Sequence, residues 1–246
     1  MRVMIINGSP KKKLSMSRYI QKTIKVMLGK TDIIECQMRT PKDIPPALEK
    51  MDGIEALVIA APLYIDGIPS NVMTFLQKAE QECKDKQYHF NVYAITNNGF
   101  IEGHQSEVNL AQYQCWAEKS GLIWGGGIGI GGGVMLGVYT IALPIALLQL
   151  LINSMGNLAL GLPPITSELL LATLKSMGLF LFFSSGMFWC EARLARHIKK
   201  QKVGDNMYTR FLIPSCLFLM CADLFMLILS IIQGGFFRNL FHREQL

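Results

Sequence analysis

Residues 3–17, VMIINGSPKKKLSMS, set the architecture of the amino-terminal half. Val3 to Ile6 form a short apolar run, and the loop that follows is rich in small and hydroxyl-bearing side chains. From Ser17 to Leu28 the apolar residues recur at helical spacing. A buried strand, a polar loop and an amphipathic helix, in that order, predict the first unit of a parallel α/β sheet.

The same alternation continues to residue 130. Apolar runs predict further strands that begin at Ile33 and that cover 55–61, 90–96 and 122–130. Helical spacing predicts helices over 70–83 and 107–120. We therefore predict an α/β fold with a flavodoxin-like, doubly wound, five-stranded parallel sheet, followed by hydrophobic helices. Right-handed crossovers place every strand-to-helix loop at the carboxyl edge of such a sheet, where ligands bind.

The fifth strand lies in a glycine-rich run with two interpretations. Residues 125–137 contain eight glycines in 13 positions. The G-x-x-x-G spacing is also found where membrane helices pack together. We favour a strand, because each glycine weakens a helix by about 1 kcal/mol relative to alanine.

Three of the predicted loops carry residues suited to a nucleotide-like ligand. Residues 7–17 place hydroxyls and backbone N–H groups at a helix start, where a phosphate binds well. Residues 61–70 contain two prolines, a glycine and the flat ring of Tyr64. Residues 96–104 offer amides and glycines for the polar edge of a heterocycle. Each loop taken alone is equally compatible with an ordinary surface turn.

Together, the three loops resemble those of the flavodoxin-like NAD(P)H-dependent FMN reductases, over about residues 1–130. The resemblance is carried by Gly8-Ser9-Pro10-Lys11 with Ser15-Met16-Ser17, by Pro62-Leu63-Tyr64 with Pro69-Ser70, and by Asn97-Asn98-Gly99-Phe100 with Gly103.

The resemblance implies an FMN-binding site with three parts. The phosphate would lie among Ser9, Lys11, Ser15, Met16 and Ser17. The isoalloxazine would be bordered by Pro62, Leu63, Tyr64 and Ile65. The pyrimidine side of that ring would face Asn97, Asn98 and Gly99. It also implies hydride transfer from NADH or NADPH to the flavin and on to an acceptor such as a quinone or free flavin. The cofactor carries this chemistry, so we assign no catalytic side chain.

Composition narrows the remaining classes of function. The net charge is +6, but the sequence contains no basic motif interleaved with aromatic residues of the kind found in RNA-binding proteins. No nucleic-acid partner is therefore expected. The four histidines have no ligand spacing, so no metal site is expected. The cysteines include no C-x-x-C pair, and no cleavable signal precedes them, which indicates reduced thiols in the cytosol.

The second half has a different character from the first. Residues 1–120 carry 28 charged side chains and residues 121–246 carry 14, with none between Gly121 and Ser167. We predict an apolar helix over 138–155 and a second helix that is capped at Thr166 or Ser167. Leu169, Leu170, Leu171 and Leu174 would cover the sheet. The uncharged stretch 176–190 is short for a bilayer crossing.

The clearest membrane signal is at the carboxyl end. Residues 211–233 contain a single charge, Asp223, and six Lys or Arg residues stand between Arg193 and Arg210. This pattern predicts an anchor at the cytoplasmic face of the cell membrane, with contact to membrane lipid. The alternative is a hydrophobic helix buried in a homodimer. The sequence is consistent with either zero or two membrane crossings between residues 134 and 190.

We expect two domains. Residues 1–178 would form the FMN-binding domain, with an apolar insertion at about 134–164, and residues 179–246 would form the anchor. The expected function is an NAD(P)H oxidoreductase. The alternatives are a flavodoxin-type electron carrier, or a non-catalytic, membrane-associated flavin-binding interaction or sensor protein.

Overall fold

The computed structural model describes residues 1–12, 15–161 and 163–232. Its sheet contains all five predicted strands and one further two-residue strand. In spatial order these are β2-β1-β3-β4-β5-β6, and all neighbouring strands run parallel. The bounds are β1 (Arg2–Asn7), β2 (Asp32–Gln37), β3 (Ala56–Pro62), β4 (Asn91–Asn97), β5 (Ile123–Ile130) and β6 (Met207–Tyr208). The order of the first five is that of the flavodoxin-like fold.

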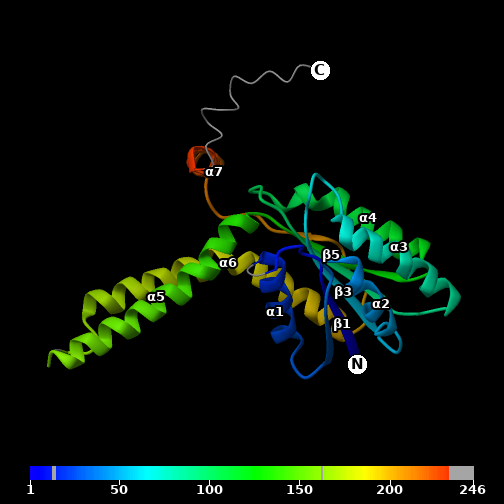
Figure 1. The fold of residues 1–246 in the computed structure, drawn as a ribbon, viewed down its shortest axis with the longest axis horizontal. Helices are drawn as coiled ribbons and strands as arrows, with labels where there is room; N and C mark the ends of the chain where they lie inside the picture. The colour runs from blue at the N-terminus through cyan, green and yellow to red at the C-terminus, as the bar shows by residue number, and fades with distance from the viewer. Residues whose placement is uncertain (13–14, 162, 233–246) are drawn as a thin grey trace, which may run out of the picture. The chain divides into compact units, whose positions relative to one another are not determined.

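Helices cover both faces of this sheet. On one face lie α1 (Met16–Leu28) and the carboxyl-terminal part of α6 (Ser167–Lys199), and on the other lie α3 (Ser70–Asp85) and α4 (Glu107–Lys119) (Figure 1). A short η1 (Pro41–Asp43) leads into α2 (Ile44–Glu49), and η2 (Gly103–Ser106) leads into α4. Because both faces are covered, β3 is buried along almost its whole length.

The glycine-rich run divides between a strand and a helix. The predicted strand is present as β5, and the chain then turns through Gly132, whose φ of 68° favours glycine. Helix α5 (Gly133–Ala159) starts five residues before the predicted Val138. A Cβ atom at Gly133 would lie 2.8 Å from the carbonyl oxygen of Asn98, so glycine lets this helix start close against the end of β4.

Helix α5 lies beside α6, which returns the chain to the sheet (Figure 1). Thr166 caps α6 as predicted, accepting a hydrogen bond from the backbone N–H of Leu169 at 3.3 Å. The prediction that the leucines after this cap cover the sheet is wrong, because Leu170, Leu171 and Leu174 are exposed. Residues nearer the other end of the same helix are buried instead: Cys190, Leu194, Ala195 and Ile198.

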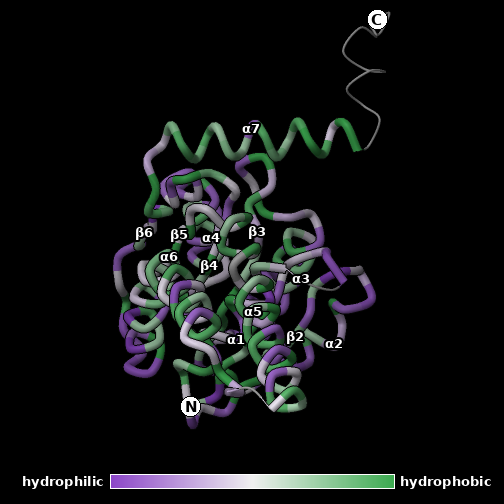
Figure 2. Tube along the Cα trace, turned by 90° about the vertical axis from the view of Figure 1, so that its left-hand side faces the viewer, coloured by the Kyte–Doolittle hydropathy of each residue, from purple (hydrophilic) through white to green (hydrophobic). Residues whose placement is uncertain are grey.

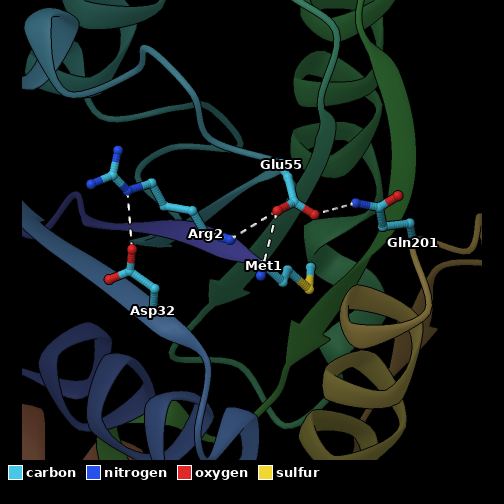
Figure 3. A network of polar contacts seen from close by, with 5 residues as sticks. All are labelled: Met1, Arg2, Asp32, Glu55 and Gln201. Carbon is cyan, nitrogen blue, oxygen red and sulfur yellow. Dashed lines mark hydrogen bonds and ion pairs between the residues drawn. The ribbon is translucent and has the colours of Figure 1, made fainter.

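A polar network connects the residues that follow α6 to the amino-terminal edge of the sheet (Figure 3). Glu55 accepts hydrogen bonds from the side chain of Gln201 at 2.8 Å and from the backbone N–H of Arg2 at 3.3 Å. The amino terminus lies 3.5 Å from the same carboxylate, and Arg2 pairs with Asp32 at 3.1 Å. The end of α6 is thus part of the sheet domain.

The chain forms two compact units, Met1–Phe211 and Leu212–Leu246. The expected domain boundary after residue 178 falls within the continuous helix α6. In the second unit, α7 (Ser215–Ile232) is hydrophobic along nearly its whole length (Figure 2). The predicted helix began at Phe211, and its last residue, Gln233, lies outside the described residues.

Among the described residues, three helices, α5, α6 and α7, have the length and the apolar composition needed to cross a membrane.

Candidate functional site

A cavity of about 520 Å³ lies at the carboxyl edge of the sheet, where the three predicted loops meet. This volume is within the range of small-molecule binding sites. Eleven of the twelve residues predicted for the site line it: Ser9, Lys11, Ser15, Met16, Ser17, Pro62, Leu63, Tyr64, Asn97, Asn98 and Gly99.

The start of α1 forms the polar end of the cavity. Ser15 caps this helix and accepts a hydrogen bond from the backbone N–H of Arg18 at 3.2 Å. Met16 and Ser17 are therefore the first helical residues, and N–H groups at such positions have no partner within their own helix. The buried Ser9 turns the preceding loop, with its N–H donating to Asn7 Oδ1 at 3.0 Å. This arrangement provides several donors to an anion.

Asn97 joins the three loops. Its Oδ1 accepts a hydrogen bond from the Ser17 hydroxyl at 3.0 Å, and its backbone carbonyl accepts one from the N–H of Leu63 at 2.9 Å. Within the described part of the chain, the Nδ2 group of Asn97 has no hydrogen-bond partner. Sequence reasoning placed Asn97 at the ligand but missed this bridging role, since nothing in the pattern indicates a contact with a residue 80 positions away.

The side chain of Asn98 serves its own loop. Its Nδ2 donates to Ser106 Oγ at 3.0 Å and to the Glu102 carbonyl at 3.2 Å, and its Oδ1 accepts from the Phe100 N–H at 3.0 Å. Asn98 reaches the cavity with both ends of its amide already satisfied. It therefore shapes the wall of the cavity without offering a free amide to a ligand.

The second loop contains a tight turn from Tyr64 to Gly67. The two backbones exchange hydrogen bonds of 3.0 and 3.3 Å, and the central residues Ile65 and Asp66 have φ values of 48° and 56°. This turn directs the half-exposed Tyr64 into the cavity and leaves Ile65 fully exposed to solvent. Ile65 is the predicted residue that does not line the cavity.

The structure adds two groups of lining residues that the sequence did not suggest. From α1 come Arg18, Tyr19 and Lys22; from α5 come Gly133, Val134, Gly137, Val138, Thr140 and Ile141. The α1 group follows the predicted loop directly, so its helical spacing was an available signal. The α5 group was not predictable, because nothing in the sequence indicates that this apolar helix starts against the loops.

The lining is electropositive. It includes Lys11, Arg18 and Lys22, and none of the described lining residues is acidic. Burial raises the pKa of the Tyr64 hydroxyl, and burial together with the charge of Glu191 raises the pKa of Tyr19 to about 12. Both tyrosines are therefore neutral at physiological pH and do not offset the cations. The cavity suits an anionic ligand.

No family model matches this chain, and no curated protein matches its sequence. Several solved structures match about half of it. The NAD(P)H:quinone oxidoreductase from Methanothermobacter marburgensis is 13% identical, with a TM-score of 0.45 over 54% of this chain and 84% of the other. The Trp repressor binding protein from Bacillus subtilis is 14% identical, with a TM-score of 0.43 over 53% and 84%. The azoreductase from Bacillus anthracis str. Sterne is 11% identical, with a TM-score of 0.41 over 54% and 87%.

Metal chemistry has no candidate centre in the described residues, since no group of three or more His, Cys, Asp or Glu side chains is placed to hold an ion.

Proposed function

We propose that this chain is an FMN-dependent NAD(P)H oxidoreductase that acts at the cytoplasmic face of a membrane. The observation that carries the proposal is the convergence of three loops on one electropositive cavity at the carboxyl edge of a flavodoxin-like sheet. When bound, FMN would supply hydride acceptance from NADH or NADPH and transfer of reducing equivalents to an acceptor such as a quinone or free flavin.

The residues present are suited to that cofactor. The N–H groups of Met16 and Ser17, aided by Lys11, would hold the phosphate, because a helix start combines free donors with the positive end of the helix dipole. Pro62, Leu63 and Tyr64 supply an apolar edge for a flat ring system. The Nδ2 group of Asn97, which has no hydrogen-bond partner among the described residues, is a donor for a polar ring edge.

Membrane association is part of the proposal. Helices α5, α6 and α7 each contain an apolar stretch of 18 residues with a mean hydropathy of 2.1, 1.5 and 2.4, respectively. Most side chains in these stretches are not buried within the protein. Exposed apolar surface on this scale requires lipid or a partner chain. We favour lipid, with a homodimer as the alternative that a mass measurement in detergent micelles would reveal.

The phosphate site is tested by removing a single backbone donor. Proline is tolerated at the first helical position, and Ser15 before it is already extended, with ψ of 149°. Met16→Pro therefore deletes the N–H of residue 16 while α1 is retained. Met16→Ala is the matched control, because it shortens the same side chain and keeps the N–H.

We expect Met16→Pro to weaken FMN binding about tenfold or more relative to Met16→Ala, as measured by flavin fluorescence titration of the detergent-purified protein. Riboflavin, which lacks the phosphate, should bind both variants equally. Equal FMN affinities would place the phosphate elsewhere. A wild-type protein that stays colourless with FMN, or whose bound flavin is bleached by neither NADH nor NADPH, would overturn the function.

A further inference from the structure

The cavity has walls of two chemical kinds. The α1 side presents Arg18 and Lys22, whereas the α5 side presents Val134, Val138 and Ile141. These three α5 side chains are about half exposed, although they line a cavity. One end of the site is therefore polar and cationic, and one side is apolar and open.

The apolar wall has little capacity for polar contacts. Thr140 is the polar side chain that α5 contributes to the described lining, and its hydroxyl donates to the Gly137 carbonyl of its own helix at 2.7 Å. No charged residue occurs between Gly121 and Ser167. A water-soluble, highly polar substrate would gain nothing from this wall.

The wall continues directly into the most exposed apolar part of α5. Beyond Ile141 the same helix exposes Ile145, Leu148 and Ile152 to its surroundings. A Cβ atom at Gly137 would meet nothing within 4 Å, so open space borders the helix where it forms the cavity. A molecule lying against α5 in the bilayer can thus reach the cavity without leaving an apolar surface.

We infer that the electron acceptor is a lipid-soluble molecule with a reducible ring and a hydrocarbon tail, of the class of tailed quinones, which enters the cavity from the bilayer along α5. This inference rests on the proposed function, since the electrons come from NAD(P)H through the flavin. The step balances: the nicotinamide gives up a hydride, and the ring takes up two electrons and two protons, one of them from water. Val134, Gly137, Val138 and Ile141 would contact the tail where it joins the ring.

Two glycines of α5 provide a matched test. Gly137 borders the cavity, Gly156 does not, and both have open space at the Cβ position. Replacing either with leucine improves helix propensity by a similar amount, so neither variant should lose stability. Only Gly137→Leu places a side chain in the proposed route.

The holoprotein is reconstituted in phosphatidylcholine nanodiscs and supplied with NADPH. The acceptors are a quinone with a long isoprenoid tail and a tail-less quinone with the same ring. We expect wild type and Gly156→Leu to favour the tailed acceptor in kcat/KM, and Gly137→Leu to lower the tailed-to-tail-less ratio at least about tenfold. An unchanged ratio in Gly137→Leu, or a wild-type preference for the tail-less quinone, would overturn the inference while flavin bleaching still upheld the proposed function.

A second readout does not depend on turnover. A tailed quinone with a photoreactive diazirine near the ring is flashed in the same nanodiscs, and the labelled peptides are mapped. We expect adducts within residues 134–141 that excess unlabelled tailed quinone competes away. Labelling confined to α7 or to other lipid-facing positions, or labelling that is not competed away, would overturn the route.

Discussion

Glu191 is a buried carboxyl group on α6. Its Oε1 accepts a hydrogen bond from the Thr23 hydroxyl of α1 at 2.9 Å, and its Oε2 has no hydrogen-bond partner among the described residues. It lies in the part of α6 that packs on the sheet domain, outside residues 167–186, the part of this helix that we propose for the bilayer. Burial raises the pKa of this carboxyl to about 8, although the Thr23 bond lowers it slightly.

This pKa predicts an unusual dependence of stability on pH. The folded state favours the neutral acid, whereas the unfolded chain ionises near pH 4.5. The contribution of Glu191 is therefore fully present below pH 4.5, is lost as the pH rises to about 8, and is constant above that. The loss amounts to about 3 to 5 kcal/mol.

Glu191→Gln should remove that slope, because the amide still accepts from Thr23 and does not ionise. The measurement is the free energy of unfolding in urea, in mild detergent, between pH 5 and pH 8.5. Glu49→Gln, at an exposed carboxyl of α2, should keep the wild-type slope. A wild-type profile that is flat over this range would contradict the buried acid.

Sequence reasoning succeeded for individual residues where position along a strand determines location. Ser9 and Tyr64 each follow a strand of the parallel sheet and Asn97 ends one, so topology alone brings them together. Sequence reasoning did not succeed for the hydrogen-bond partners of individual side chains. The amide of Asn98 turns back to its own loop, and the contact of Glu191 with Thr23 depends on a return of the chain 168 residues later.

Among the structural elements, the turn from Tyr64 to Gly67 stores backbone strain. Ile65 and Asp66 both adopt positive φ, as do the central residues of type I′ turns, which are normally Asn or Gly. A β-branched residue in this region costs on the order of 1 kcal/mol or more. The side chain of Ile65 recovers none of this cost within the described structure, because it is fully exposed.

Ile65→Gly should therefore stabilise the ligand-free protein by about 1 kcal/mol, as measured by urea unfolding in detergent. Ile65→Ala is the control, since it removes the same exposed side chain but keeps a Cβ atom, and it should gain much less. If alanine and glycine give equal gains, the side chain rather than the backbone would be responsible. A loss of stability with glycine would refute the strained turn.

Periodicity and apolar runs located the first five strands and the helices α1, α3 and α4, because each repeats the same local pattern, but they did not reveal the short helix α2 between β2 and β3. They did not reveal β6, since two residues carry no periodicity and Met207 pairs with Ile128 only through the return of α6. They also treated the uncharged stretch 176–190 as separate from the helix that precedes it. A single exposed charge does not interrupt an α-helix, so the predicted 15-residue apolar stretch is the middle of a 33-residue helix.

The molecule as a whole combines a sheet domain with a helical hairpin whose length is close to the thickness of a bilayer core. Helix α5 has 27 residues, of which residues 142–159 extend beyond the cavity lining and cover about 27 Å at 1.5 Å per residue, close to the thickness of the hydrocarbon core, about 30 Å. In α6, residues 167–186 cover about 30 Å and are mostly exposed, with Thr173, Phe180 and Ser184 buried among them. The hairpin is therefore long enough for two crossings, which returns the basic residues of α6 to the side of the sheet domain.

Lys175 is the main cost of this topology. It lies about 12 Å from the start of α6, where a buried ammonium is expensive but a long side chain can extend toward the headgroups. Glu168 lies at the far end and needs no such extension. The charge pattern thus permits a crossing whose distal end lies where α5 ends and α6 begins.

Two crossings predict that opposite ends of the hairpin lie on opposite sides of the membrane. Cys115, exposed on α4, should react with a membrane-impermeant maleimide only from the cytoplasmic side. Ile165→Cys, near the distal end of the hairpin, is introduced in a background without other exposed cysteines and should react only from the opposite side. Both measurements use vesicles of known orientation from which carbonate does not extract the protein. Labelling of both positions from the same side would show that the hairpin re-enters or packs in a dimer, and the lipid route along α5 would then lack its bilayer. Only a whole-molecule measurement decides this, because the length, hydropathy and exposure of each helix are the same in either arrangement.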